Sequence, residues 1–234
     1  MFIPILSVVT AIFATLTIVL RRQGKSFQGM LCKFISSFGF MSIAFIGFCY
    51  RIEAADKLNR PFYFCLVAFG LLFGLGGDVL LGIKEIAPKY KNKLIALGTV
   101  SFLIGHFFYL AAFYNAEPTF SLIPYIIALV ITVTIALIMK AVKMKLDGKM
   151  YALCVFYFYV IALGACVSAH MLYLTHELTF VLTTIASVVF VISDSVLAFI
   201  YFTPVKKKNP LVTLELATYY IGQVLMATTV YLVK

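Results

Sequence analysis

Charged residues are scarce in this chain of 234 residues. They make up 12% of the sequence, about half of their usual share in a soluble domain, whereas 63% of the residues are hydrophobic and the mean hydropathy is +1.06. A water-soluble protein of this length cannot bury so much apolar surface, so an ordinary globular fold is excluded. The apolar residues also lack the period-two alternation of a membrane β-barrel, which leaves transmembrane helices.

Several well-known catalytic and metal-binding signatures are missing as well. The chain contains no nucleophile elbow of a serine hydrolase, no HExxH zinc motif, no P-loop and no dinucleotide-binding glycine pattern in a suitable context. The glycines of Gly74-Leu-Gly-Gly lie inside an apolar helical run and therefore do not form a phosphate-binding loop. The five cysteines have an odd count and no CxxC spacing, which predicts core-filling thiols rather than disulfides or a metal site.

Long apolar stretches are what the sequence does contain. Each has about 19 residues or more, close to the length that crosses a bilayer as a helix. The stretches are joined by short connections that leave no room for a soluble domain. We therefore expect an all-α integral membrane protein with eight transmembrane helices in one bundle. The expected spans are residues 2–20, 29–50, 61–83, 93–115, 119–140, 150–174, 178–203 and 211–233.

The net charge of +10 is distributed along the chain in a way that indicates membrane topology. Most lysines and arginines lie beside odd-numbered loops; of the 19, the exceptions are Arg51, Lys57, Arg60 and the terminal Lys234. The positive-inside rule then places both termini outside the cytoplasm. We expect the basic residues to contact lipid headgroups at a cell membrane, and we expect no nucleic-acid partner.

Two aspartates lie inside expected spans, Asp78 in the third and Asp194 in the seventh. A charged side chain at the centre of an inserted helix costs about 2.5–3.5 kcal/mol, so such residues usually face a protein interior or a water-filled pocket. With one carboxyl protonated and the other ionised, the two would form an acid–base pair. In the expected topology both lie in the cytoplasmic halves of their spans, which favours a lipid-like substrate.

An internal similarity relates the two halves of the chain. Phe102-Leu-Ile-Gly-His106 in the fourth span resembles Tyr219-Tyr-Ile-Gly-Gln223 in the eighth. Asp78 precedes His106 by 28 residues, and Asp194 precedes Gln223 by 29. This spacing predicts two four-helix halves related as a parallel repeat, because an even number of spans preserves orientation. The four polar residues would then line one cavity.

Four motifs follow one another along the chain: Gly77-Asp-Val-Leu-Leu81, Phe102-Leu-Ile-Gly-His-Phe-Phe-Tyr109, Ser193-Asp-Ser-Val-Leu-Ala198 and Tyr219-Tyr-Ile-Gly-Gln223. In this order they resemble the motifs of the YhhN-like family of membrane lysoplasmalogenases. The resemblance extends from about the second span to the eighth, and the number of helices agrees with it. Lys33, near the start of the second span, also matches a lysine of the family, although Phe34 stands where a proline commonly follows.

The resemblance implies hydrolysis of the vinyl-ether bond of lysoplasmalogens, which releases a fatty aldehyde and a glycerophospho-choline or -ethanolamine. It implies no dissociable cofactor, and no metal is expected. Two carboxylates suit this chemistry, since one can protonate the alkene while the other stabilises the resulting cation and activates water. We expect Asp78 and Asp194 to be the catalytic pair, with their division of labour open. The residues expected to position substrate or water are Lys33, His106, Tyr109, Ser193, Tyr219 and Gln223.

Other functions share some of these sequence features. A proton-coupled transporter of a lipid-like or small solute would also carry intramembrane acids and a repeat, although no span has the proline-broken character of a discontinuous helix. A metal-dependent lipid hydrolase would use His106, Asp78 and Asp194 as ligands. A receptor or structural bundle would use the acids for packing.

Overall fold

The computed structural model describes residues 2–53, 61–205 and 208–233, and within these ranges the chain is helical with no β-strand. It forms eight α-helices and one short 3-10 turn, η2, at Pro88–Tyr90. The helices are α1 (Phe2–Arg22), α2 (Ser26–Glu53), α3 (Pro61–Ile86), α4 (Lys91–Ala116), α5 (Ile123–Ala141), α6 (Gly148–Thr175), α7 (Leu178–Phe202) and α8 (Asn209–Leu232).

Local signals in the sequence explain several helix ends. Helix α5 begins at Ile123, later than the expected start at residue 119, because Pro124 occupies its first turn. Proline is favoured there since its missing N–H would have no partner in a helix. Asp147 caps α6 by accepting a hydrogen bond of 2.8 Å from the backbone N–H of Met150.

Seven of the helices, α1 to α7, are long and apolar enough to cross a membrane. Helix α8 is more polar, because Glu215, Tyr219 and Gln223 follow one another along one of its faces. All three side chains are buried, and α8 packs against α1, α2, α3 and α7. Its polar face therefore meets protein instead of lipid. That α8 spans the membrane as the eighth helix stays a prediction.

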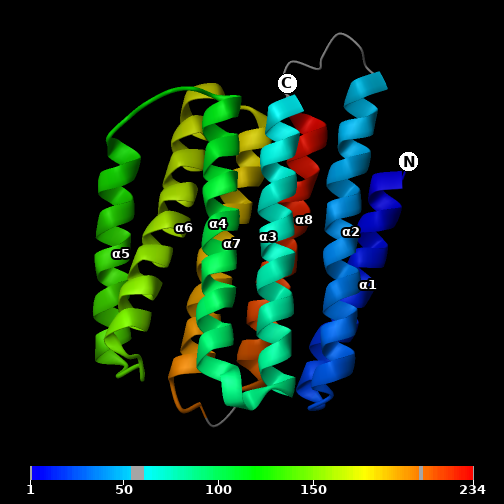
Figure 1. Cartoon of the computed structure of the whole chain (residues 1–234). Coiled ribbons are helices and arrows are strands. Elements are labelled where there is room, and N and C mark those ends of the chain that lie inside the picture. Colours follow the sequence, from blue (N-terminus) through cyan, green and yellow to red (C-terminus); the bar gives the residue numbers. More distant parts are fainter. Residues whose placement is uncertain (1, 54–60, 206–207, 234) are drawn as a thin grey trace.

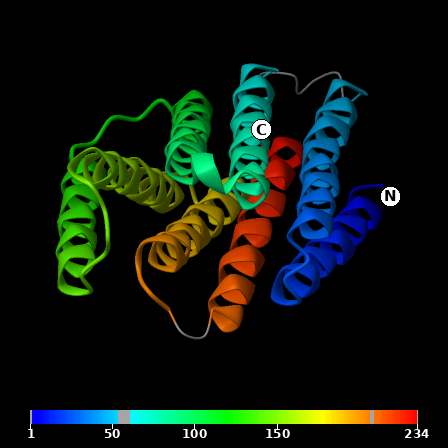
Figure 2. The ribbon, with the colours of Figure 1, turned by 60° about the horizontal axis from the view of Figure 1, so that its bottom comes forward.

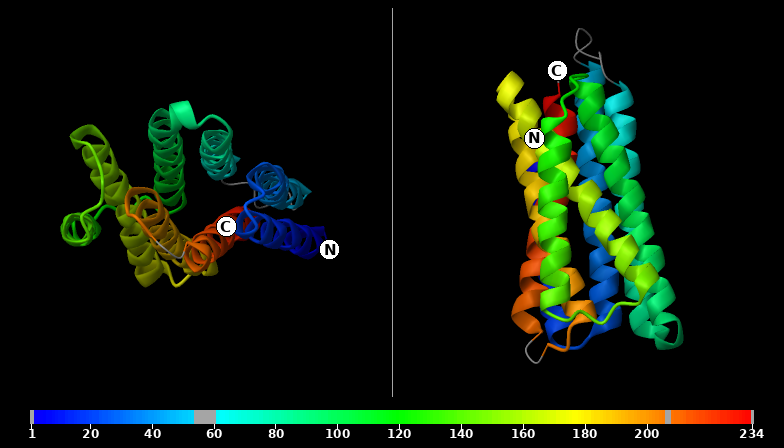
Figure 3. Two further views of the ribbon diagram at one scale, coloured as in Figure 1. Left: turned by 90° about the horizontal axis from the view of Figure 1, so that it is seen from below. Right: turned by 90° about the vertical axis from the view of Figure 1, so that its left-hand side faces the viewer.

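Six helices form a closed ring. Contacts join α2 to α3, α3 to α4, α4 to α6, α6 to α7, α7 to α8 and α8 back to α2. Figures 2 and 3 show α1 and α5 outside this ring, at opposite sides, with α1 against α2 and α8 and α5 against α6. The outer surface of α5 carries exposed apolar side chains such as Ile126, Leu129 and Val133. These are suited to contact with lipid tails.

The connections α1–α2, α3–α4, α5–α6 and α7–α8 all lie at one end of the bundle, the lower end in Figure 1. We call it the basic end, because described residues such as Arg21, Arg22, Lys89, Lys91 and Lys145 lie there or in the adjoining helix turns. The positive-inside rule predicts that this is the cytoplasmic end. The location of the termini outside the cytoplasm stays a prediction that follows from this rule.

The helix neighbours agree in part with the predicted repeat. When α2, α3 and α4 are exchanged with α6, α7 and α8, every contact of the ring falls on another contact of the ring, and α1 corresponds to α5. The contacts of α8 with α1 and α3 have no counterpart in the other half among the described residues. The neighbour pattern is thus compatible with two four-helix halves, and the repeat itself stays a prediction.

Helices α3 and α4 pack closely because glycines lie where they approach each other. A Cβ atom added at Gly105 would be 2.9 Å from the backbone oxygen of Gly70 and 3.5 Å from the Cβ of Phe73. Backbone atoms cannot move aside as a flexible side chain can. The small residues of α3 therefore serve helix packing, as expected of closely packed membrane helices.

Replacing Gly105 by alanine is expected to destabilise the protein by about 1–3 kcal/mol, the usual cost of overpacking. The measurement is thermal unfolding of the purified protein in detergent. Gly164→Ala in α6 is the matched control, since its added Cβ meets only Phe113, at 4.0 Å. Equal stability of the two variants would contradict the proposed α3–α4 packing.

Candidate active site

Asp78 is at the centre of a charged cluster inside the ring. The Nζ atom of Lys33 on α2 lies 2.8 Å from Asp78 Oδ1. Tyr219 on α8 donates a hydrogen bond of 2.7 Å to Oδ2, and Ser37 donates one of 3.2 Å to the same oxygen. Asp78 is 3% exposed and Lys33 6%. With an ammonium group and two hydroxyl donors around it, Asp78 is held as a carboxylate.

A chain of hydrogen bonds extends from this cluster across the interior. Gln223 Nε2 donates to the Tyr219 hydroxyl at 3.0 Å, and the Tyr109 hydroxyl donates to Gln223 Oε1 at 2.8 Å. The Nζ atom of Lys33 also lies 4.8 Å from the ring centroid of Tyr219, a cation–π distance. Five expected site residues from α2, α3, α4 and α8 thus belong to one connected network.

Asp194 is the centre of a second group with different chemistry. The Tyr157 hydroxyl on α6 donates a short hydrogen bond to Asp194 Oδ2, and His106 Nε2 lies 3.9 Å from the same oxygen. Within the described part of the chain, no lysine or arginine forms an ion pair with Asp194. The imidazole of His106 packs edge-on against the rings of Tyr109, Tyr157 and Phe190. Asp194 therefore has a hydrogen-bond donor as its partner but no lysine or arginine to balance a negative charge.

The two aspartates share the ring interior but do not form a hydrogen-bonded pair. Helices α3 and α7 are not neighbours in the ring; a side-chain contact of Lys84 with the ring of Tyr201 joins them near the basic end. The ring of Phe190 connects the two groups, with its centroid 5.2 Å from that of His106 and 6.4 Å from that of Tyr219. Asp194 still interacts electrostatically with Asp78 and Lys33. The carboxyl groups are thus coupled through space and not by direct contact.

Two further buried residues belong to the site, and sequence reasoning did not select them. Glu215 is 3% exposed and interacts electrostatically with Asp78 and Lys33. The sequence pointed to Glu215 only through its position on the same helix face as Tyr219 and Gln223. Nothing in the sequence distinguishes Tyr157 from the other tyrosines, of which the chain has 14 in all.

Ser193, another expected site residue, has a structural contact. Its hydroxyl donates a hydrogen bond of 3.0 Å to the backbone oxygen of Glu215. This bond connects α7 to α8 one residue before Asp194. In this structure the serine therefore contacts the neighbouring helix backbone and holds the position of Asp194.

Two openings reach the acids. A groove of about 330 Å³ between α2 and α3 extends to Lys33 and Asp78, and its rim carries exposed apolar side chains. A smaller cavity of about 40 Å³ lies beside Asp194 and Tyr157. That volume is enough for a water molecule or a small group. The rim residues of the groove are Leu31, Phe34 and Ile83.

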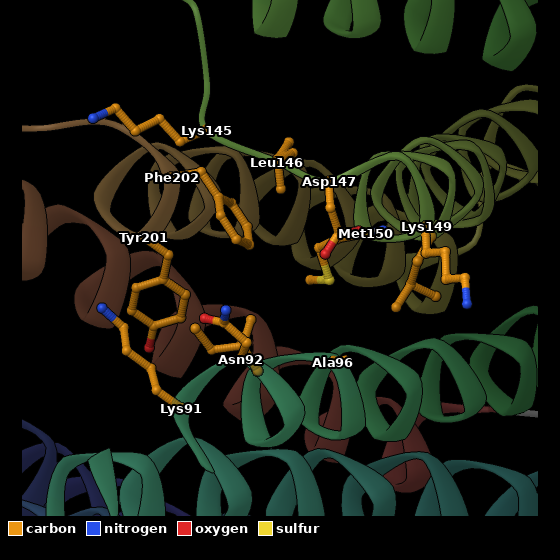
Figure 4. A pocket seen from close by; sticks show the side chains of 12 residues that line it. Lys91, Asn92, Ala96, Lys145, Leu146, Asp147, Lys149, Met150, Tyr201 and Phe202 are labelled. Atoms are coloured by element: carbon orange, nitrogen blue, oxygen red, sulfur yellow. Dashed lines mark hydrogen bonds between the residues drawn. The ribbon is translucent and has the colours of Figure 1, made fainter. Parts of the chain in front are cut away.

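A larger cavity of about 550 Å³ opens at the basic end, between α4, the α5–α6 connection and the end of α7. Figure 4 shows Lys91 and Asn92 of α4 beside Tyr201 of α7, while Lys145 and Lys149 extend at the two sides of the view. Tyr201 and Phe202 line both this cavity and the small one at Asp194. The basic end is thus connected to the Asp194 group through shared walls.

The ligands of the metal alternative are not gathered in one place. Over the described ranges, no three His, Cys, Asp or Glu side chains are grouped closely enough to hold a metal ion. His106 lies beside Asp194, whereas Asp78 is surrounded by Lys33, Ser37 and Tyr219.

These features define a polytopic helical membrane protein with a charged site enclosed by a ring of helices. The model of the YhhN family matches residues 30–230, and the chain therefore belongs to the YhhN family. This match confirms the resemblance carried by the four motifs, and it includes all of the ring except the first turn of α2 and the end of α8. Searches of curated proteins and of solved structures found no significant match.

Lys33→Met is expected to destabilise the protein by about 3–5 kcal/mol, because it leaves the carboxylate of Asp78 buried without its cation. The double variant Lys33→Met with Asp78→Asn is expected to recover most of this loss. Thermal unfolding in detergent measures both, and Lys25→Met, at an exposed position of the same end, is the control. If the double variant is no more stable than Lys33→Met, the ion pair is not the cause.

Proposed function

We propose that this protein hydrolyses the vinyl-ether bond of lysoplasmalogens, giving a fatty aldehyde and a glycerophospho-choline or -ethanolamine. Membership of the YhhN family is consistent with a membrane lysoplasmalogenase. The observation that supports the reaction most directly is the presence of two chemically different carboxyl groups, Asp78 and Asp194, inside the ring. Vinyl-ether cleavage requires a proton donor and a negative charge near the cation that forms.

Asp194 is the proton donor in this proposal. A buried charge without a counter-ion is costly, so a carboxyl group without a lysine or arginine partner is suited to the neutral, proton-carrying form. His106 Nε2, at 3.9 Å from Asp194 Oδ2, is placed to orient a water molecule beside the acid. The small cavity beside Asp194 gives a water molecule or a small group a place next to the acid.

The bond changes in this mechanism balance as follows. The Asp194 carboxyl proton is transferred to the distal alkene carbon, and the π electrons form the new C–H bond. The carbon attached to oxygen becomes part of an oxocarbenium ion. Water adds to that carbon and gives a proton to the Asp194 carboxylate, which forms a hemiacetal. The Asp194 carboxyl then gives its proton to the glycerol oxygen as the C–O bond breaks, and the hemiacetal hydroxyl gives its proton back to the Asp194 carboxylate. This step releases the aldehyde, leaves a glycerol hydroxyl and restores the protonated acid.

Asp78 is the stabilising carboxylate in this proposal. Lys33, Tyr219 and Ser37 hold it ionised and fixed, so it is poorly placed to exchange a proton. A fixed negative charge in a low-dielectric interior favours the oxocarbenium ion over the neutral substrate.

Asp194→Asn and Asp78→Asn are each expected to lower aldehyde release from a synthetic lysoplasmalogen by about 100-fold or more, the usual contribution of a positioned acid or base. Tyr157→Phe should cause a smaller loss, because the carboxyl group itself remains. The measurement is steady-state aldehyde formation by purified protein in detergent.

Glu177→Gln is the matched control, since it removes a carboxylate at the start of α7, at the end of the helix away from Asp194. It should retain full activity. Full activity of either aspartate variant would disprove the paired-acid mechanism.

A chelator is expected to leave aldehyde release unchanged, because the proposed steps use side chains alone. Loss of activity with chelator and its return with zinc would instead support the metal-dependent hydrolase. Uptake of a solute into liposomes driven by a pH gradient, without aldehyde formation, would support the transporter.

A further inference from the structure

A second cavity at the basic end has four cations among its ten lining residues. It has a volume of about 450 Å³ and lies where α1, α3, α4, α7 and α8 come together. We call it the basic cavity. The lining residues that matter here are Arg21, Lys84, Glu85, Lys91, Tyr201 and Lys208. Four cations against one carboxylate leave a positive surplus, which suits an anionic ligand.

Lys84 is the most unusual member of this group. It is only 5% exposed, although lysine is rarely buried to this extent. Its ammonium group contacts the Glu85 carboxylate and lies 4.4 Å from the ring centroid of Tyr201. The side chain of Glu85 is 40% exposed and shared with solvent. The ammonium group of Lys84 is therefore held at the cavity wall and can donate a hydrogen bond to a further acceptor.

Two hydroxyl groups of the same wall lack partners. The Tyr201 hydroxyl and the Thr203 Oγ1 atom are buried and have no hydrogen-bond partner among the described residues. A buried hydroxyl without a partner costs free energy, which a ligand with acceptor oxygens would recover. Phosphate oxygens accept hydrogen bonds from hydroxyl, ammonium and guanidinium groups alike.

The basic cavity is connected to the Asp194 group through Tyr201. This residue lines the basic cavity, the 550 Å³ cavity and the small cavity at Asp194. Asp194 and Tyr201 are two turns apart on α7, which corresponds to about 10.5 Å along the helix axis. In an extended lysoplasmalogen, the phosphorus and the distal vinyl carbon are separated by seven bonds, or about 9 Å for single bonds of about 1.5 Å. The distance along α7 is thus similar to the distance from the phosphorus to the distal vinyl carbon.

We infer that the basic cavity binds the phosphate group of a lysophospholipid headgroup and so places the vinyl ether at the depth of Asp194. The inference rests on the proposed function for the identity of the lipid. Lys84 and Arg21 bind the phosphate oxygens, Tyr201 forms the wall between the two places, and the hydrocarbon chain extends deeper into the bundle.

Equilibrium binding in detergent tests this site without any reaction. The probes are a 1-O-alkyl-lysophosphocholine, which lacks the reactive double bond, and the 1-O-alkylglycerol of the same chain length, which lacks the phosphate. The wild-type protein is expected to bind the phosphate-bearing lipid at least about tenfold more tightly, the value of one charge-assisted contact. Lys84→Gln and Arg21→Gln are each expected to remove most of that preference.

Matched variants separate the binding effect from folding and from charge alone. Lys93→Gln removes an exposed cation of the same end that lines neither basic-end cavity, and it should keep the full preference. Lys84→Arg should also keep it. If Lys84→Gln fails to fold, the exposed Lys91→Gln tests the same cavity. Unchanged preference in both Arg21→Gln and Lys91→Gln would overturn the inference.

Kinetics and competition identify the source of the phosphate. For aldehyde release, Arg21→Gln should raise KM about tenfold with kcat within about twofold of wild type, because binding and not the chemical step is changed. Inorganic phosphate should compete only weakly with the lysolipid. Competition by inorganic phosphate at the lysolipid's own affinity would assign the cavity to free phosphate and overturn the headgroup site. Selective lysolipid binding without aldehyde release would refute the proposed hydrolysis and retain the headgroup site.

Discussion

The ion pair of Lys33 and Asp78 is the interaction on which the ring depends most. Hydrocarbon does not tolerate an isolated charge, so Asp78 must meet Lys33 from α2 and Tyr219 from α8 at the same place. Such a pair adds little net stability over an apolar contact, yet breaking it is costly. The ion pair therefore favours this arrangement of helices over others, because any arrangement that separates α2, α3 and α8 leaves a buried charge without its partner.

The two acids occupy similar positions and have different partners. Asp78 is contacted from α2 and α8, and Asp194 from α6 and α4, the helices that correspond in the two halves. On α2 the contact includes an ammonium group, whereas on α6 it is the neutral hydroxyl of Tyr157. In the proposed mechanism, the predicted repeat thus places a carboxylate with a counter-ion on one side of the ring and a proton donor on the other. The proposed division of labour comes from these neighbours, which no spacing in the sequence specifies.

Much of the architecture was predictable because lipid demands continuous apolar helices, and both aspartates could be found because they interrupt such runs. The path of the ring was not predictable. The apolar run of α5 resembles the others, and only the contacts show that α4 meets α6 and leaves α5 outside. Lys33 was selected by family resemblance and not by its chemistry, since a lysine near a helix start also serves as a topology signal. Tyr157 is recognisable only from its contact with Asp194.

The positions of the two aspartates along their helices relate the proposed reaction to the basic residues at the helix ends. Asp78 and Asp194 both lie nearer to the basic end of α3 and α7 than to the opposite end. A lysolipid that enters from the inner leaflet carries its phosphate at the surface and its ether bond about one headgroup deeper. Cations at the helix ends and carboxyls two turns inside therefore match the order of groups along such a molecule. In the proposed mode of binding, some of the basic side chains that direct membrane topology also bind the substrate.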